Sequence, residues 1–521
     1  MTRAAARHLG DFDVAVVGSG CAGSVLARAL AKGGCRVLLV ERGHHPRFAL
    51  GESSTPLAAL ALERLATRGM PDLRDLASYG RWRARLPHLR RGLKRGFTFY
   101  SHAAGEPFAN GEANERRLLV AASPDDAVAD AHWLRADVDA HLVAAAAAAG
   151  VRYVDGVRLD GCEESEGRLR LAGEDDAGRL IAGASFVVDA SGPGGFLAKA
   201  LQLPAGTPAQ ALDTGLLYAH VEGAGSFAAA ASAAGARIQP GPYPDDRAAV
   251  HHLLAEGWMY VLPFDHGVAS CGFVVEGDPT AHGLAPAADP EKAWHRLLAR
   301  YPTLGAQLAG AAFVSGPRWV PRVQHRLGRA AGARWALVPH AFAFTDPLFS
   351  TGLAWSFLAV ERLAGLLLGG EGSLADYDAL LACEADQIER LVALAYAARG
   401  DFAAFAAAAF LYFATVSFEE VRQRLLEPPA AGWCWRGFLG AGEPELEHAF
   451  ATATRRFRED PATFPAWVTD TIAPRNIVGL ADPARRNLYP VDLEALVAAA
   501  PKLGLSDDEM RAALPRLRSP G

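Results

Sequence analysis

The segment from residue 12 to residue 41 constrains the fold of this chain more than any other part of the sequence. An apolar, β-branched run at residues 14–17 predicts a buried strand, and it leads into the glycine-rich string G-S-G-C-A-G. An alanine- and leucine-rich helix follows, whose N-terminus faces the place where a pyrophosphate binds. A second strand ends in an acid at the spacing that binds a ribose hydroxyl. The pattern predicts a dinucleotide site with contacts at Gly18, Gly20, Gly23 and Glu41.

Further strings indicate which dinucleotide binds. They are E-R at 41–42, G-E-S-S-T-P at 51–56, W-L-R-A-D-V-D at 133–139, D-A-S-G-P-G-G at 189–195 and D-P-L-F-S-T-G at 346–352. Together they resemble the flavin-dependent halogenases, a tryptophan halogenase-like family of the FAD monooxygenase superfamily. The resemblance runs from about residue 12 to residue 362.

The resemblance implies that the chain binds FAD and uses it in the reduced form. Because the sequence holds one nucleotide fingerprint, we expect a separate NAD(P)H:flavin reductase to supply reduced FAD. Beyond the glycine string, the resemblance implies cofactor contacts at Arg42, Ser53, Arg135 and Asp346.

The resemblance also implies a chloride or bromide site at Thr351 and Gly352, where successive backbone N–H groups at a helix start form an anion nest. The alternative for this turn is an ordinary helix N-cap by Ser350 or Thr351.

The order of the predicted elements indicates an α/β fold. We expect a Rossmann-type FAD-binding domain with an inserted β-sheet substrate domain and a C-terminal helical region. Strands predicted at 151–154, 185–189 and 335–338 and helices at 137–150 and 353–368 make the FAD-binding domain discontinuous. The expected division is 1–206 with 327–372 for the FAD-binding domain, 207–326 for the substrate-binding sheet domain, and 373–521 for the helical region.

Lys94 is the predicted catalytic residue. It lies in the string G-L-K-R-G-F-T-F-Y, which resembles the part of the halogenases that carries an essential lysine. An ammonium can hydrogen-bond hypohalous acid and direct it, and in a dry pocket its pKa falls toward neutrality. The alternative is an exposed surface lysine among Arg90, Arg91 and Arg95.

Two departures from the family pattern bear on the substrate. Tryptophan halogenases carry a glutamate where this chain has Phe349, and the family's W-x-W-x-I-P, which is thought to block direct oxygenation by the flavin, reads Trp258-Met-Tyr260-Val-Leu-Pro. We therefore expect an electron-rich aromatic substrate of the phenol, pyrrole or indole type, free or tethered to a carrier protein, rather than free tryptophan. The predicted substrate pocket comprises Phe97, Trp258, Tyr260 and Phe349.

Two alternatives remain open at this point. One is an FAD-dependent hydroxylase or reductase of the same fold, which the Tyr260 and Phe349 departures keep open. The other is a flavin-binding protein without turnover.

Composition excludes several other classes. The formal net charge of −6 over 521 residues argues against a nucleic-acid-binding surface. Six scattered cysteines without a C-x-x-C pair indicate reduced thiols in a cytoplasmic protein, and no pattern indicates a metal site.

The apolar run between Asp401 and Glu419 is shorter than a membrane span and predicts a core helix. Arg318, Arg322 and Arg326 predict a solvated face, with the lining of an anionic substrate channel as the alternative. His251 and His252 should point to opposite faces of a strand.

Overall fold

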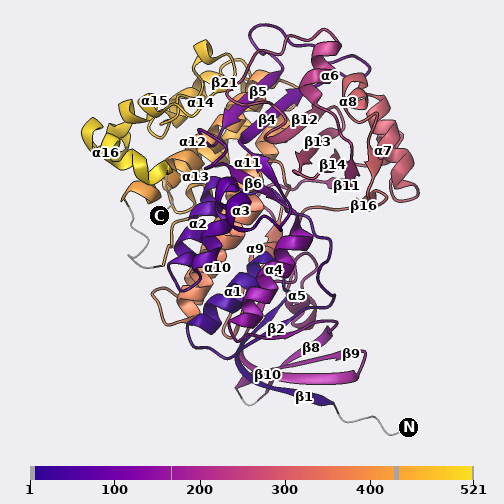
Figure 1. The fold of residues 1–521 in the computed structure, drawn as a ribbon, viewed down its shortest axis with the longest axis vertical. Coiled ribbons are helices and arrows are strands. Elements are labelled where there is room, and N and C mark those ends of the chain that lie inside the picture. Colours follow the sequence, from indigo (N-terminus) through magenta and orange to yellow (C-terminus); the bar gives the residue numbers. More distant parts are fainter. Residues whose placement is uncertain (1–5, 166, 427–432, 519–521) are drawn as a thin grey trace.

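The computed structural model describes residues 6–165, 167–426 and 433–518. Its described part holds two large sheets, which occupy the lower and upper halves of the molecule in Figure 1. The first sheet has the order β18-β19-β10-β1-β2-β7, and β8 and β9 extend it beside β10. Its strands are β1 (Arg7–Val17), β2 (Val37–Val40), β7 (Arg152–Val154), β8 (Arg158–Ser165), β9 (Arg168–Asp175), β10 (Gly178–Asp189), β18 (Ala331–Gly332) and β19 (Trp335–Leu337).

Parallel pairing of β1 with β2 and β10, and of β10 with β19, makes the centre of this sheet a doubly wound nucleotide-binding fold. The central strands are apolar on both faces because helices pack against them. These helices are α1 (Cys21–Lys32), α2 (Pro56–Ala66), α4 (Arg135–Ala148) and α10 (Thr351–Leu367). The predicted Rossmann-type α/β fold is confirmed, and β19 joins the sheet from 146 residues beyond the end of β10 (335 − 189).

The second sheet has the order β15-β11-β14-β13-β12-β4-β5-β21, with β16 paired to β11. Its strands are β4 (Gly96–Ser101), β5 (Arg117–Ala121), β11 (Thr214–Glu222), β12 (Ala249–Leu254), β13 (Gly257–Pro263), β14 (Val268–Glu276), β15 (Ala312–Phe313), β16 (Arg318–Val320) and β21 (Leu488–Tyr489). Strands β4 and β5 lie within residues 1–206, yet they pair in this sheet, with β4 beside β12.

Alternation along the second sheet separates its two faces. On β13, Trp258 and Tyr260 belong to the core shared with the nucleotide-binding half, whereas Met259 and Val261 pack under α6 (Phe227–Ala233), α7 (Pro290–Ala299) and α8 (Pro302–Gln307). His251 stacks on Phe99, and the neighbouring His252 stacks on Tyr100 behind the sheet. The predicted opposite orientation of the two histidines is confirmed.

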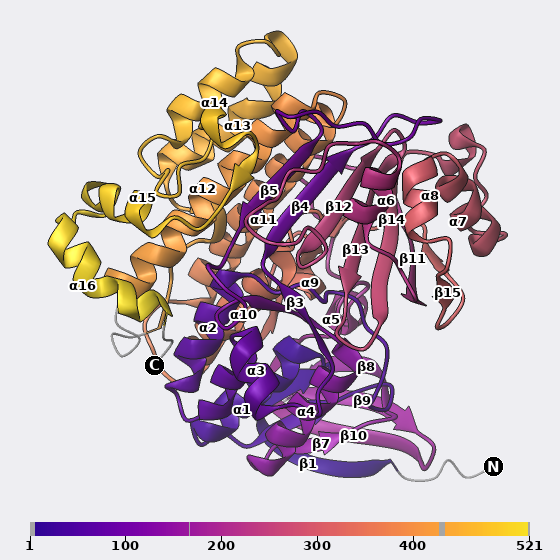
Figure 2. The same cartoon turned by 45° about the horizontal axis from the view of Figure 1, so that its top comes forward.

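The C-terminal part is helical, as predicted, and covers the β4–β5 end of the second sheet in Figure 2. Its elements are α11 (Leu374–Ala398), α12 (Phe402–Leu426), α13 (Pro444–Glu459), α14 (Phe464–Ile472), α15 (Leu493–Ala498) and α16 (Asp507–Arg518). Helix α12 is longer than the predicted apolar run and is, among the described residues, the one helix long and apolar enough to cross a membrane. However, 72% of its apolar window is buried inside the molecule, and Phe405 and Phe413 pack on the aromatic rings of β4, as expected of a core helix.

The remaining short strands place the lysine of interest. β3 (Arg91–Lys94) and β6 (Asp130–Trp133) form an antiparallel ribbon between the two large sheets. Lys94 is the last residue of β3.

Candidate functional site

A pocket at the carboxyl ends of β1, β2 and β10 collects much of the predicted nucleotide site. Its walls enclose about 1520 Å³, with the open mouth included. This is the edge where doubly wound sheets bind ligands. Three of the predicted cofactor contacts, Gly18, Glu41 and Arg42, line it together with Arg47, Phe48, Ser191 and Lys199.

The glycines are required by close approaches of the backbone. Gly18 has φ +99°, and a Cβ there would lie 2.5 Å from the carbonyl oxygen of Ala190. A Cβ on Gly23 would lie 2.0 Å from the carbonyl oxygen of Gly18, so α1 can approach β1 only without a side chain there. The two positions fit the turn of a dinucleotide cradle.

Glu41 is buried and held by donors from the glycine turn. The Ser19 amide and hydroxyl each donate to the Glu41 carboxylate at 3.0 Å, and Arg47 donates at 3.1 Å. Burial raises the pKa of Glu41, but the Ser19 amide and the Arg47 charge outweigh it, so the pKa lies below its usual range. Glu41 therefore stays ionised and can accept a hydrogen bond from a ribose hydroxyl. Arg47 was not predicted, because it lies in an irregular loop without a strand or helix pattern around it.

Arg135 ties the loop after β2 to the glycine turn. Its guanidinium pairs with Asp139 and donates to the carbonyl oxygens of Leu50 and Gly51. A Cβ on Gly20 would lie 3.3 Å from Arg135 Nη2, so the predicted contacts Gly20 and Arg135 are neighbours. Ser53 lies further along this loop, in a bridge to His132, and among the described residues its hydroxyl has no hydrogen-bond partner.

The predicted halide nest is the first turn of α10. Ser350 precedes it in the left-handed region, with φ +53°. No side chain caps the helix, so the alternative of a Ser350 or Thr351 side-chain cap is absent from this described turn. The first N–H groups of a helix have no partner within it. His340, which the sequence analysis missed, has its Nε2 2.8 Å from where a Cβ on Gly352 would lie. Burial, together with Arg135, lowers the pKa of His340 to about 4, so the ring is neutral.

Asp346 is enclosed by protein donors. One carboxylate oxygen accepts from the Leu348 amide at 2.8 Å, and the other accepts from the Tyr396 hydroxyl at 2.8 Å. Trp258 Nε1 donates to the same hydroxyl at 3.0 Å, which links the W-x-Y strand to Asp346. Burial raises the pKa of Asp346 to about 7, against the lowering effect of Tyr396. The role of Asp346 as a flavin contact stays a prediction.

Lys94 is completely buried, which rules out the exposed-lysine alternative. Its Nζ donates to the carbonyl oxygen of Ser54 at 2.6 Å and lies 4.1 Å from the ring centroid of Phe97. Burial lowers the pKa of Lys94 well below its usual range, while the charge of Asp130 opposes the shift. Lys94 thus lies between the end of the loop that follows β2 and an aromatic wall formed by Phe97.

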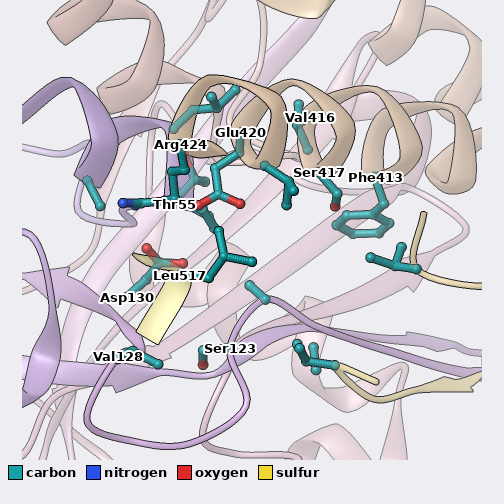
Figure 3. A pocket seen from close by; sticks show the side chains of 18 of the residues that line it. Thr55, Ser123, Val128, Asp130, Phe413, Val416, Ser417, Glu420, Arg424 and Leu517 are labelled. Carbon is teal, nitrogen blue, oxygen red and sulfur yellow. Dashed lines mark hydrogen bonds and ion pairs between the residues drawn. The ribbon is translucent and has the colours of Figure 1, made fainter. Parts of the chain in front are cut away.

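That wall belongs to a pocket between β4, β5, α2 and α12, which we call the Asp130 pocket (Figure 3). Its walls enclose about 1370 Å³ with the mouth included. The residues that define it here are Thr55, Phe97, Ser123, Asp130, Phe413 and Glu420. Lys94 is not part of the pocket surface. The surface does include Phe97, whose ring the lysine contacts, and Thr55, which follows Ser54 in the sequence.

The other predicted pocket residues lie behind the surface of the Asp130 pocket. Phe349 is fully buried, with its ring centroid 5.0 Å from that of Tyr412, which lines the pocket. Trp258 and Tyr260 are neighbours on β13, with ring centroids 6.0 Å apart. Of the four, Phe97 alone forms part of the wall.

Two smaller points concern Arg326 and the metal-ligating side chains. Arg326 is not on a solvated face: it is largely buried and pairs with Asp386 and Glu389 of α11, because those acids offset its charge. Among the described residues, no group of three or more metal-ligating side chains is close enough to hold a metal ion.

Comparison with known proteins bears on this site. The family described as tryptophan halogenase matches residues 110–406, which is more than half of the chain. The chain belongs to the tryptophan halogenase family. The predicted family is thus confirmed, and residues 16–55, which include the glycine turn, match an NAD(P)-binding Rossmann-like domain.

Similar relatives within this family include two bacterial halogenases. The chain is 31% identical to tetracycline 7-halogenase of Kitasatospora aureofaciens over 70% of its own length and 64% of that protein. It is 29% identical to monodechloroaminopyrrolnitrin halogenase PrnC of Pseudomonas fluorescens over 68% of its own length and 61% of that protein. The match thus spans less than two thirds of either relative.

The fold extends further than these sequence matches. The crystal structure of halogenase PltM in complex with phloroglucinol and FAD superposes with a TM-score of 0.79. It covers 92% of this chain and 99% of that one, at 23% identity. The helical region of this tryptophan halogenase family member therefore belongs to a fold that is also found in a solved halogenase.

Proposed function

We propose that the protein is an FAD-dependent halogenase that adds chlorine or bromine to an electron-rich aromatic ring. The observation that carries this proposal is the burial of Lys94 between the Ser54 carbonyl and the Phe97 ring. A lysine is seldom buried without a counter-charge in contact, and its low pKa suits a group that exchanges protons near neutral pH. Family membership and the nucleotide cradle support the same function.

The residues of the cradle fit FAD. Gly18, Gly20 and Gly23 admit a pyrophosphate close to the backbone, and Glu41 is held ionised for a ribose. When bound in its reduced form, FAD supplies the electrons with which dioxygen and a halide ion yield hypohalous acid. A separate flavin reductase delivers the reduced cofactor in this proposal.

The chain's own residues then hold and direct the oxidant. The N–H groups at Thr351 and Gly352 hold the halide, and the buried Phe349 keeps the neighbouring turn free of water and of negative charge. In this proposal Lys94 exchanges its hydrogen bond to the Ser54 carbonyl for one to hypohalous acid, and it presents the halogen to a ring that lies beside Phe97 and Phe413 in the pocket. The six free thiols are consistent with a cytoplasmic enzyme.

Lys94→Ala tests this function. We expect the variant to bind FAD and to release hypohalous acid, measured with a diffusible amine trap, but to halogenate a phenol at least ~100-fold more slowly than wild type. Lys292→Ala, which removes an exposed lysine of α7, is the matched control and should keep the wild-type rate. Product formation by Lys94→Ala at the wild-type rate would refute the role of the lysine.

A further inference from the structure

Asp130 is a buried acid without a hydrogen-bond partner. The residue is 5% exposed, and no described group donates a hydrogen bond to its carboxylate. Buried carboxylates normally have donors, because desolvation without compensation is costly. The remaining surface of Asp130 faces the Asp130 pocket, so a ligand in that pocket can supply the missing donor.

The register of the β3–β6 ribbon sets Asp130 beside Lys94. The two residues are direct cross-strand partners, so their side chains leave the ribbon on the same face, with Cβ atoms about 5 Å apart. Yet no ion pair of 4.0 Å or less joins them, because Lys94 turns to the Ser54 carbonyl. The acid faces the pocket, the amine lies behind the pocket wall, and the two groups do not neutralise each other by contact.

The rest of the pocket distinguishes Asp130 from its other acids. Figure 3 shows the carboxylates of Asp130 and Glu420 bordering the same space. Glu420 pairs with Arg424, which also pairs with Glu63 at 2.5 Å, so both of these acids have a partner. Ser123 also lines the pocket, and among the described residues its buried hydroxyl has no partner.

The pocket thus offers aromatic side chains and the unsatisfied carboxylate of Asp130, which is acceptor-only when ionised. A phenol complements this arrangement: its ring stacks on Phe97 and Phe413, and its hydroxyl donates to Asp130. A pyrrole or indole ring has a weaker acid to offer at this position. We propose that Asp130 is the base that accepts the hydroxyl proton of a phenolic substrate, in place of the glutamate whose position holds Phe349, an inference that rests on the proposed halogenase function.

The step balances as follows. The phenol hydroxyl proton passes to the Asp130 carboxylate while a ring carbon forms a bond to the halogen of hypohalous acid. The halogen–oxygen bond breaks, and the departing hydroxide takes a proton from the Lys94 ammonium and leaves as water. The ring C–H proton then passes to the Lys94 amine, and Asp130 returns its proton to the ring oxygen.

The charges around Asp130 suit a base that works near neutral pH. Burial raises the pKa of Asp130, Lys94 from β3 opposes the rise, and from α12 Glu420 raises it and Arg424 lowers it. The phenol rate should therefore increase as pH rises toward neutrality and Asp130 ionises.

Asp130→Asn tests the inference on the full-length holoenzyme with its reductase. The substrates are a phenol, its methyl ether, and a fluorinated phenol that is already ionised in the buffer. We expect the variant to halogenate the plain phenol at least ~100-fold more slowly, with the rise of rate toward neutral pH abolished. The loss should be much smaller for the fluorinated phenol, which needs no base, and absent for the methyl ether, which has no proton to give.

Controls separate this inference from the proposed function. Asp126→Asn, which alters an aspartate paired outward with Arg95 and Arg247, should match wild type on all three substrates. FAD titration and hypohalous acid release should be unchanged in Asp130→Asn. If Asp130→Asn does not retain FAD, Asp130→Ser replaces it in the same assays.

Equal losses on the phenol and its methyl ether, or no loss on either, would overturn the role of Asp130 while the halogenase function stands. Failure of wild type to form hypohalous acid or any halogenated product would overturn the function itself, and this inference with it.

Discussion

Asp346→Asn should change how stability depends on pH, because burial raises the pKa of this acid in the folded protein. Burial raises this pKa to about 7, above the ordinary value of 3.8 for an aspartate. Between these two values the folded protein binds more protons than the unfolded chain, so wild-type stability falls as pH rises. The gap between 3.8 and about 7 corresponds to about 4 kcal/mol of unfolding free energy at full effect. The asparagine cannot ionise, so the variant lacks this part of the pH dependence.

Chemical denaturation of flavin-free wild type and Asp346→Asn from pH 4 to pH 8 measures the effect. Relative to wild type, the variant should gain unfolding free energy steadily as pH rises, by up to about 4 kcal/mol. Most of the gain should appear before pH 7. Asp126→Asn, which alters a partly exposed aspartate paired with Arg95 and Arg247, should stay parallel to wild type. Parallel curves for Asp346→Asn would show that Asp346 is ionised in the folded protein, as an acid that faces solvent or cofactor would be.

Three further predictions concern the cradle and the halide turn. Gly20→Val places branched methyl groups against Arg135, which lies 3.3 Å from the Cβ position, and should abolish FAD binding in a fluorescence titration; retained binding would mean that the cradle is elsewhere. Arg47→Ala removes a charged donor from the wall of the same pocket and from Glu41, so the Kd for FAD should increase by about 10- to 100-fold, and an unchanged Kd would refute the contact. Phe349→Glu buries a carboxylate beside Tyr412 and the halide turn, so it should weaken halide use and give no tryptophan turnover. The variant should also become less stable than wild type as pH rises above ~4.3, because the buried carboxylate must ionise. Efficient tryptophan halogenation at unchanged halide affinity would contradict the idea that Phe349 keeps the halide turn free of water and of negative charge.

The nucleotide half was predictable because its constraints are local. Gly18 needs a positive φ and Gly23 a close approach to the Gly18 carbonyl, and both leave a direct trace in the sequence. The strand β10 and helix α10 follow from short apolar runs next to glycine-rich turns. These features depend on neighbours within a few residues, so periodicity and glycine spacing reveal them.

The chemistry of the second half depends on contacts that periodicity does not encode. Asp130 becomes notable only when the β3–β6 register sets it opposite Lys94. Tyr396 joins Trp258 to Asp346 across 138 and 50 residues of sequence, respectively. His340 follows an ordinary short strand, and only the packing of α10 shows that its ring faces Gly352. Residues of this kind could have been suspected from their type but not assigned from one sequence.

The most direct test of the central claim is the mass of the product formed by wild type with FAD, a flavin reductase, NADH, oxygen and bromide on a panel of phenol, pyrrole and indole substrates. We expect a bromine isotope doublet on a phenolic product, and the doublet should disappear without bromide, without oxygen or in Lys94→Ala. A product that gains oxygen instead of bromine, or flavin oxidation with every aromatic left unchanged, would contradict the assignment of this chain as a halogenase.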